Sequence, residues 1–188
     1  MNLIFVRHAE TTLNKSGIFC GRTDCDVTLE GLKQAKNLLK DNEKDFDFIY
    51  ISPLKRTRQT LDVILPNSNP IIDERIIEAY LGEWEGKNKS SVDQNLLALY
   101  RVGKYTPLGA ETPEDVDRRV CSFIKSLFGK YQSNQRILIV THNGVMKSIK
   151  RNFVKDYGNI MSKNLETITI TDTEFEYYLQ SKKSQGTT

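Results

Sequence analysis

Three short apolar runs constrain the fold of this chain more than any other feature. They are residues 3–6 (LIFV), 46–51 (FDFIYI) and 136–141 (RILIVT). The runs are rich in Ile, Val, Phe and Tyr, and none alternates cleanly with polar residues. This pattern is typical of strands that a parallel sheet buries on both faces.

Helical patterns lie between these runs. Residues 28–44 carry apolar side chains at helical spacing, and Thr28 is a candidate N-cap. Residues 112–130 form the clearest helix, because Thr112 and Asp115 can make a capping box around Pro113. Its apolar stripe consists of Val116, Val120, Phe123, Ile124 and Leu127.

Two late strands are predicted at residues 166–171 and 175–180, either paired as a hairpin or split across the sheet edge. Strands that alternate with helices predict an α/β fold, a three-layer sandwich with a mostly parallel central sheet flanked by helices. We expect a single domain over residues 1–180, followed by a polar tail, 181–188, that frays.

Composition excludes several classes of protein. The chain has 188 residues, 38% apolar and 27% charged, which is typical of a globular domain with a real core. No apolar run approaches the roughly 20 residues that cross a bilayer, and the opening is too short for a signal peptide. The net charge of +3 neither requires nor excludes an anionic partner, and the absence of a basic stripe interleaved with aromatics argues against nucleic acid. Three cysteines without framework spacing indicate reduced thiols and a cytoplasmic protein.

Cationic groups follow each of the three buried runs. Arg7 and His8 end the first, Lys55 to Arg58 follow the second, and His142 with Asn143 end the third. Ligands of open α/β sheets bind beyond the carboxyl ends of the strands, so these groups are expected to meet. One histidine alone is more often structural than catalytic, but both histidines of the chain occupy such positions. The pattern favours a pocket for a small dianion, with phosphate as the simplest candidate.

Carboxylates come from a fourth segment, residues 73–88, where Glu78, Glu83 and Glu85 surround glycines and Trp84. The glycines indicate a tight loop that brings backbone close to another segment. A carboxyl group beside a phosphate pocket could act as a general acid. The alternative is an exposed turn with solvated carboxylates.

The motifs resemble those of the histidine phosphatase superfamily, in its phosphoglycerate mutase-like branch. The opening VRHAETTLN with GRTDCDVTLEGLKQA is similar to the first family motif, and ISPLKRTRQT to the second. ERIIEAYLGEWEG, GAETPEDVDRRV and ILIVTHNGVM are similar to the next three, in the family order. Three residues depart from those usual in the family. Ala9 is a small residue in place of glycine, and Leu13 and Ile76 keep an apolar side chain at their positions.

The resemblance implies a role for each matching residue. His8 would be the nucleophile that becomes phosphohistidine, and Glu78 the proton donor. Arg7, Arg56 and a protonated His142 would hold the phosphoryl oxygens. The implied substrate contacts are Asn14, Cys20, Gly21 and Asn143, although Cys20 could equally be an inert thiol. The resemblance implies neither a metal nor a cofactor.

The resemblance also implies the activity, a phosphatase acting on a small phosphorylated metabolite. Sugar-phosphate, α-ribazole-phosphate and broad-specificity enzymes all remain open. The short segment 87–111 is expected to form the lid that selects the substrate, and its shortness disfavours the alternative, a phosphoglycerate mutase. A non-catalytic phospho-ligand binding module is less favoured because the nucleophile, both arginines and the acid are present. The sequence does not indicate the oligomeric state.

Overall fold

Five strands form one sheet in the computed structural model of the chain, which describes residues 1–156 and 160–185. The order is β3-β2-β4-β1-β5, and only β5 runs antiparallel to its neighbour β1. The bounds are β1 Asn2–Arg7, β2 Phe48–Ile51, β3 Ile71–Ile72, β4 Arg136–Thr141 and β5 Thr167–Ile170. The three predicted buried strands are therefore confirmed, and they lie side by side as β2, β4 and β1.

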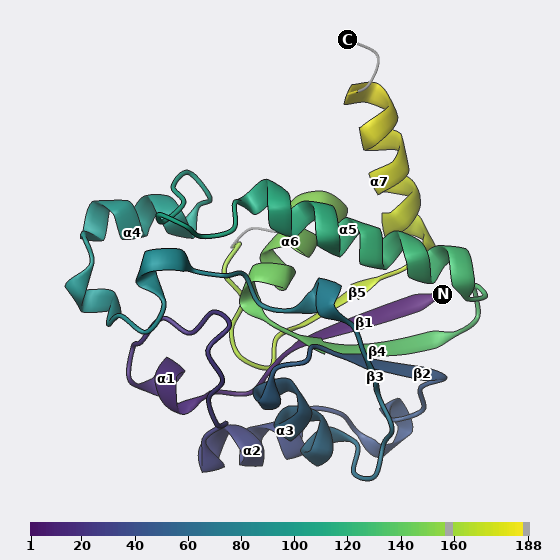
Figure 1. Ribbon diagram of the computed structural model, residues 1–188. Helices are drawn as coiled ribbons and strands as arrows, with labels where there is room; N and C mark the ends of the chain where they lie inside the picture. The colour runs from purple at the N-terminus through teal and green to yellow at the C-terminus, as the bar shows by residue number, and fades with distance from the viewer. Residues whose placement is uncertain (157–159, 186–188) are drawn as a thin grey trace.

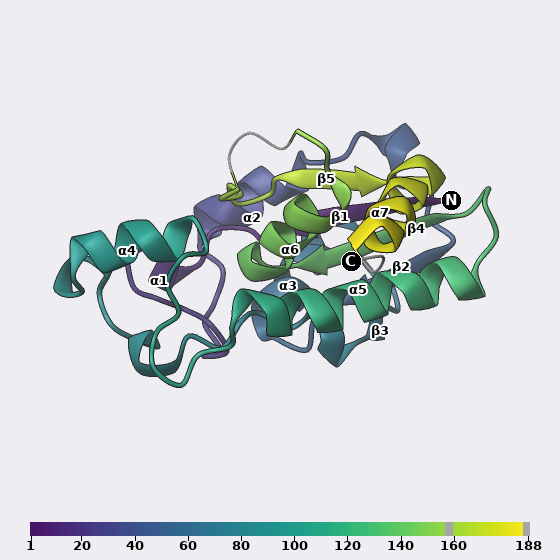
Figure 2. The same cartoon turned by 90° about the horizontal axis from the view of Figure 1, so that it is seen from above.

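Helices cover both faces of this sheet, as Figure 1 shows. One face carries α2 (Leu29–Lys36) and α3 (Lys55–Ile64). The other carries α5 (Pro113–Lys130), α6 (Asn143–Phe153) and α7 (Asp172–Gln185), which lie over the sheet in Figure 2. Side chains of β4 alternate between the two apolar cores, with Ile137 on one side and Leu138 on the other. This confirms the predicted three-layer sandwich.

The predicted helix starts are correct, and one predicted helix is too long. Thr28 accepts a hydrogen bond from the amide of Gly31, and Thr112 forms the expected capping box with Asp115. The helix predicted over 28–44 ends at Lys36, and only a 3-10 turn, η1 (Asp41–Glu43), follows it. Asn and Asp residues are poor helix formers, and several of them follow Lys36, where the helix ends.

The strand predicted over residues 175–180 is wrong, because this segment lies in α7. The carboxylate of Glu174 accepts a hydrogen bond from the amide of Thr171 at 2.9 Å, which caps a helix start. Helical spacing then places Phe175 on Phe128, with ring centroids 3.9 Å apart, and Tyr178 on Phe153, at 4.5 Å. The helix continues to Gln185 through the predicted tail, and residues 186–188 lie outside the described part.

The remaining elements gather beyond the carboxyl ends of the strands, where Figure 1 shows α1 (Thr12–Lys15) and α4 (Gln94–Arg101). Three short 3-10 turns, η2 (Glu74–Ile76), η3 (Gly82–Trp84) and η4 (Lys89–Ser91), complete the fold. A separate apolar cluster of Phe19, Leu81, Trp84 and Leu97 fixes α4 in this region. Within the described residues, no helix is long and apolar enough to cross a membrane.

Replacing Phe153 with alanine should destabilise the protein by about 3–5 kcal/mol, because this fully buried ring supports both α6 and α7. The measurement is the free energy of unfolding in urea. The control is Tyr177→Ala on α7, whose side chain is 42% exposed. A loss below about 1 kcal/mol for Phe153→Ala would contradict the packing of α7.

Candidate active site

The His8 side chain lies directly after β1 and has a defined tautomer. Its backbone amide donates to the carbonyl of Thr141 at 2.9 Å, which extends the pairing of β1 with β4. The ring is only 3% exposed, and Nδ1 lies 2.7 Å from the carbonyl oxygen of Ala9. A carbonyl can only accept, so Nδ1 carries the proton and Nε2 keeps its lone pair.

His142 follows β4, and its ring centroid lies 5.2 Å from that of His8. Nδ1 accepts a hydrogen bond from Nε of Arg56 at 3.2 Å, and Nε2 donates to Oγ of Ser52 at 2.7 Å. Burial lowers the pKa of both histidines well below 6.5, and the nearby Arg56 charge lowers each pKa further. The expectation of a protonated His142 is therefore wrong for this arrangement, in which the ring is neutral.

Arg56 lies on the first turn of α3 and is only 1% exposed. Its guanidinium donates to the carbonyl oxygens of Gly21 at 2.6 Å and Thr23 at 3.0 Å. Glu85 holds the same loop, since its Oε1 accepts from the amides of Gly21 and Thr23 at 2.9 and 2.8 Å. A Cβ on Gly21 would lie 2.7 Å from the backbone carbonyl oxygen of Ala79 and 2.3 Å from Oε2 of Glu85, so only glycine fits here.

Arg7, the last residue of β1, brings a second guanidinium to the same place. It donates to the carbonyl of Ser162 through Nη1. Its Nε is buried and has no hydrogen-bond partner among residues 1–156 and 160–185. Burial lowers the pKa of Arg7, while the charge of Glu78 opposes this effect. An unpaired buried donor of this kind favours an anionic ligand.

Glu78 is the carboxylate that reaches the site. Its side chain is buried, and Oε1 accepts from the amides of Ala79 and Gly144, both at 2.8 Å. The amide of Gly144 belongs to the first turn of α6, where the helix dipole favours negative charge. Glu83 is exposed instead, and Glu85 supports the loop below Arg56. Of Glu78, Glu83 and Glu85, Glu78 is thus the one suited to act on a ligand.

One pocket brings together most of the residues that the sequence indicates. It is lined by Arg7, Asn14, Cys20, Glu78 and Asn143, together with Phe19, Lys89, Tyr100 and Met161 among others. Four indicated residues are not among the lining residues, namely His8, Arg56, His142 and Gly21. Gly21 acts through its carbonyl on Arg56.

Three of these lining residues are held by neighbouring groups. Oδ1 of Asn143 accepts from the amide of Ser162 at 3.0 Å. Cys20 turns toward its own loop, with Sγ 3.1 Å from Sγ of Cys25. Asn14 caps α1, since its Oδ1 accepts from the amide of Thr11 at 3.3 Å.

Sequence reasoning missed several residues that support the site. Ser52 directly follows β2 and holds His142, so its position at a strand end was an available signal. Asn164 donates to the carbonyl of His8 at 2.9 Å and to Oδ1 of Asn14 at 3.3 Å. No pattern in its stretch of sequence indicates this role. Within the described residues, no group of three His, Cys, Asp or Glu side chains could hold a metal ion.

The fold and this cluster of histidines, arginines and a carboxylate define an enzyme of the phosphoglycerate mutase-like class. The family described as Histidine phosphatase superfamily (branch 1) matches residues 3–183, so the chain belongs to this superfamily. A phosphorylated small molecule is the substrate that this membership implies.

Individual relatives carry different activities. The chain is 34% identical over 157 residues to phosphoserine phosphatase 1 of Hydrogenobacter thermophilus, covering 79% of this chain and 74% of the relative. It is 29% identical over 154 residues to the adenosylcobalamin/alpha-ribazole phosphatase of Escherichia coli, covering 78% and 75%. A crystal structure of phosphoglycerate mutase from Thermus thermophilus is 26% identical, with a TM-score of 0.73 and 90% and 92% of the two chains covered.

Gly144→Ala should lower kcat/KM for an aryl phosphate on the order of 100-fold, because the new Cβ would lie 2.3 Å from Oε1 of Glu78 and displace the carboxylate. Gly129→Ala is the matched control in α5, since its Cβ would meet nothing within 4 Å. This control should keep full activity and gain roughly 0.5–1 kcal/mol of stability. Equal kinetics for the two variants would contradict the placement of Glu78.

Stability should fall as the pH drops from 7.5 to 5.5. The two histidines are the only ones in the chain, and both stay neutral in the folded state below their ordinary pKa of 6.5. Below pH 6.5 the histidines of the unfolded chain bind protons. For each histidine, the free energy of unfolding should therefore fall by about 1.4 kcal/mol per pH unit until the pKa of the folded state is reached. Urea unfolding at several pH values measures this slope, and His8→Asn should halve it. A flat profile in the wild-type protein would show that the rings are not buried in the neutral form.

Proposed function

We propose that the protein is a metal-independent phosphatase that hydrolyses a small phosphomonoester metabolite through a phosphohistidine at His8. The observation that supports this most directly is the contact of Nδ1 with the carbonyl of Ala9. It holds the imidazole as a neutral nucleophile with a free Nε2, as attack on phosphorus requires. The depressed pKa keeps the ring in this form even in mildly acidic solution.

In the first step, Nε2 of His8 attacks phosphorus and the bond from phosphorus to the ester oxygen breaks. Arg7 and Arg56 stabilise the equatorial oxygens, whose charge grows in a loose transition state. The free Nε of Arg7 supplies one such donor. Glu78, in its protonated form, gives its proton to the leaving alcohol oxygen, an effect worth roughly 100- to 10,000-fold.

In the second step, water attacks the phosphohistidine and the bond from nitrogen to phosphorus breaks. Glu78, now a carboxylate, takes the proton from the attacking water and is ready for the next cycle. Inorganic phosphate leaves, and His8 returns to the neutral tautomer held by Ala9. His142 can support both steps by donating from Nδ1 to a phosphoryl oxygen in its other neutral tautomer, in which Nε2 accepts from the hydroxyl of Ser52 and Nδ1 no longer accepts from Arg56.

A small phosphorylated metabolite is the proposed substrate. Phosphoserine phosphatase and α-ribazole phosphatase relatives support this class. The proposed lid, residues 87–111, contributes only the short elements η4 and α4 to the pocket, through Lys89 and Tyr100. A mutase-type phosphoryl transfer is the alternative, favoured by the similarity to the Thermus thermophilus mutase structure.

Phosphate release from an aryl phosphate and from a panel of phosphorylated metabolites tests this proposal. Wild-type protein should release phosphate without added metal, and His8→Ala should lower the rate on the order of 10⁴-fold or more. Labelled phosphate trapped by rapid quenching should be acid-labile and alkali-stable, as phosphohistidine is. Label on a serine or aspartate would overturn the mechanism. Conversion of 3-phosphoglycerate to its isomer without phosphate release would instead support the mutase.

A further inference from the structure

We propose that Cys20 and Cys25 form a reversible disulfide bond with a peroxide as the oxidant, and that this bond lowers the activity of the candidate active site through Arg56. Formation of the bond is independent of the proposed phosphatase function, whereas its effect on turnover rests on that function. We call residues 20–25, which carry both thiols, the cysteine loop.

The two thiols of the cysteine loop lie in contact. Sγ of Cys20 is 3.1 Å from Sγ of Cys25, and both cysteines are free. A disulfide bond is about 2.0 Å long, so the sulfurs need to move roughly 1 Å closer together. Both side chains are half-buried, and residues 22–24 between them are exposed. Small rotations of two side chains in an exposed loop can supply this movement, and a peroxide can reach the sulfurs.

The surroundings of Cys25 favour a reactive thiolate. The hydrogen bond with Cys20 lowers the pKa of the Cys25 thiol to about 6, although burial raises it. A hydrogen bond with Thr11 and the charge of Arg56 lower the same pKa further. The hydrogen bond with Cys25 raises the pKa of Cys20, as does burial. A thiolate is the nucleophile in thiol oxidation, so Cys25 is the thiol that attacks and Cys20 the one that closes the bond.

The reaction balances with one molecule of hydrogen peroxide. The Cys25 thiolate attacks one peroxide oxygen, a sulfur–oxygen bond forms, and the oxygen–oxygen bond breaks to release hydroxide, which takes a proton from solvent. The sulfur of Cys20 then attacks the Cys25 sulfur, and the leaving hydroxide takes the thiol proton of Cys20 as water. Two thiols are thus oxidised to one disulfide, and the peroxide is reduced to water. A small dithiol reverses the change by thiol–disulfide exchange.

The cysteine loop also holds Arg56. Between the two cysteines lie Gly21 and Thr23, whose carbonyl oxygens accept hydrogen bonds from the Arg56 guanidinium at 2.6 and 3.0 Å. Sγ of Cys20 donates to the same Thr23 carbonyl at 3.2 Å, and the disulfide bond removes this donor. Drawing the ends of the loop together by about 1 Å should therefore move both carbonyls and displace the guanidinium.

A second connection joins the cysteine loop to α3, the helix that carries Arg56. Oδ1 of Asp24 accepts a hydrogen bond from the amide of Lys55 at 2.9 Å, where α3 begins. Oδ1 of Asp26, directly after the loop, accepts from Nε2 of Gln59 at 2.7 Å. A change in the loop therefore reaches Arg56 through the start of its helix as well as through its guanidinium.

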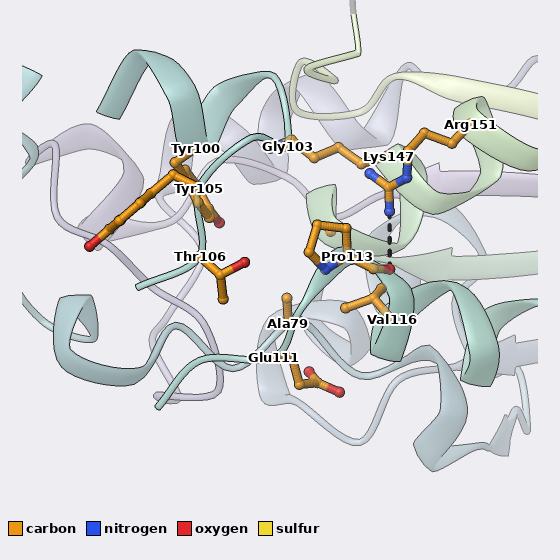
Figure 3. Close-up of a pocket in the computed structure, with 11 residues that line it drawn as sticks. Ala79, Tyr100, Gly103, Tyr105, Thr106, Glu111, Pro113, Val116, Lys147 and Arg151 are labelled. Atoms are coloured by element: carbon orange, nitrogen blue, oxygen red, sulfur yellow. Dashed lines mark hydrogen bonds between the residues drawn. The ribbon is translucent and has the colours of Figure 1, made fainter. Parts of the chain in front are cut away.

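The thiol pair belongs to the phosphate end of the binding region. Cys20 lines the pocket of the candidate active site. The neighbouring cavity, drawn in Figure 3 with Tyr105 and Lys147 on opposite sides, shares Tyr100 and Gly144 with that pocket. None of the described residues that line this cavity is a cysteine. Oxidation should therefore act on the groups that hold phosphate rather than on the cavity.

Peptide mapping tests the bond itself. Trypsin cleaves after Arg22, which lies between the two cysteines. Wild-type protein treated with hydrogen peroxide and then denatured in N-ethylmaleimide should give two peptides joined by a disulfide, with Cys121 alkylated. The protein should run as a single chain on a denaturing, non-reducing gel. Alkylated Cys20 and Cys25, or a bond that includes Cys121 or a second chain, would overturn the proposal.

Activity with an aryl phosphate tests the effect of the bond. Oxidised wild-type protein should lose on the order of 10- to 100-fold in kcat/KM, because a shift of about 1 Å in a catalytic group has an effect of this size. Dithiothreitol should restore the activity. Cys25→Ser should keep wild-type activity when reduced and resist peroxide, and Cys20→Ser should resist it relative to its own untreated activity.

The matched control is Cys121→Ser, which removes the buried thiol of α5 and should respond to peroxide as the wild type does. An equal loss of activity in wild type and Cys25→Ser, or a disulfide that leaves kcat/KM unchanged, would refute the effect on the site. A loss that dithiothreitol does not reverse would also refute it, and would indicate irreversible oxidation of another sulfur such as that of Met161 in the pocket.

Binding of inorganic phosphate separates failure of this proposal from failure of the phosphatase function. Calorimetry should give a Kd on the order of tenfold higher for oxidised than for reduced wild-type protein, because a displaced guanidinium loses its charge-assisted hydrogen bonds to phosphate. The absence of turnover in reduced wild-type protein would refute the phosphatase and leave this measurement intact. Equal phosphate binding with and without the disulfide would refute the link to Arg56.

Discussion

The buried guanidinium of Arg56 is the constraint on which the site depends. A buried cation is costly unless its donors are satisfied, and here two loop carbonyls and a neutral imidazole satisfy them. These partners come from the loop at Gly21 and Thr23 and from the end of β4. One side chain therefore ties together segments that are far apart in the sequence. Because its partners are not carboxylates, its positive charge remains available to an anion.

That charge explains the protonation states around it. Arg56 and burial together disfavour protonation of His8 and His142, so the pKa of each histidine is low. A neutral ring with a free Nε2 is nucleophilic, whereas an imidazolium would only attract the phosphate. The site thus combines cations that attract phosphate with a histidine that can attack it. In the proposed mechanism, Glu78, bound at the start of α6, supplies the proton that the leaving group requires.

Helix α6 lines the pocket of the candidate active site with its first turn. This turn holds the carboxylate of Glu78 through the amide of Gly144, and the next turn carries Lys147, whose Nζ lies 4.7 Å from the ring centroid of Tyr100. A rigid helix fixes the distance between the two groups more precisely than a loop could. Tyr100 of α4 also lines the pocket of the candidate active site.

The sequence by itself determined the buried parallel strands, the caps at Thr28 and Thr112, and the residues that end the strands. These follow from local periodicity and from the rule that parallel strands meet at one edge. Only the tertiary structure decided that residues 175–180 are helical, that His142 is neutral and that Ser52 and Asn164 hold the two histidines. Each of these depends on contacts between segments distant in sequence, which spacing along the chain does not encode.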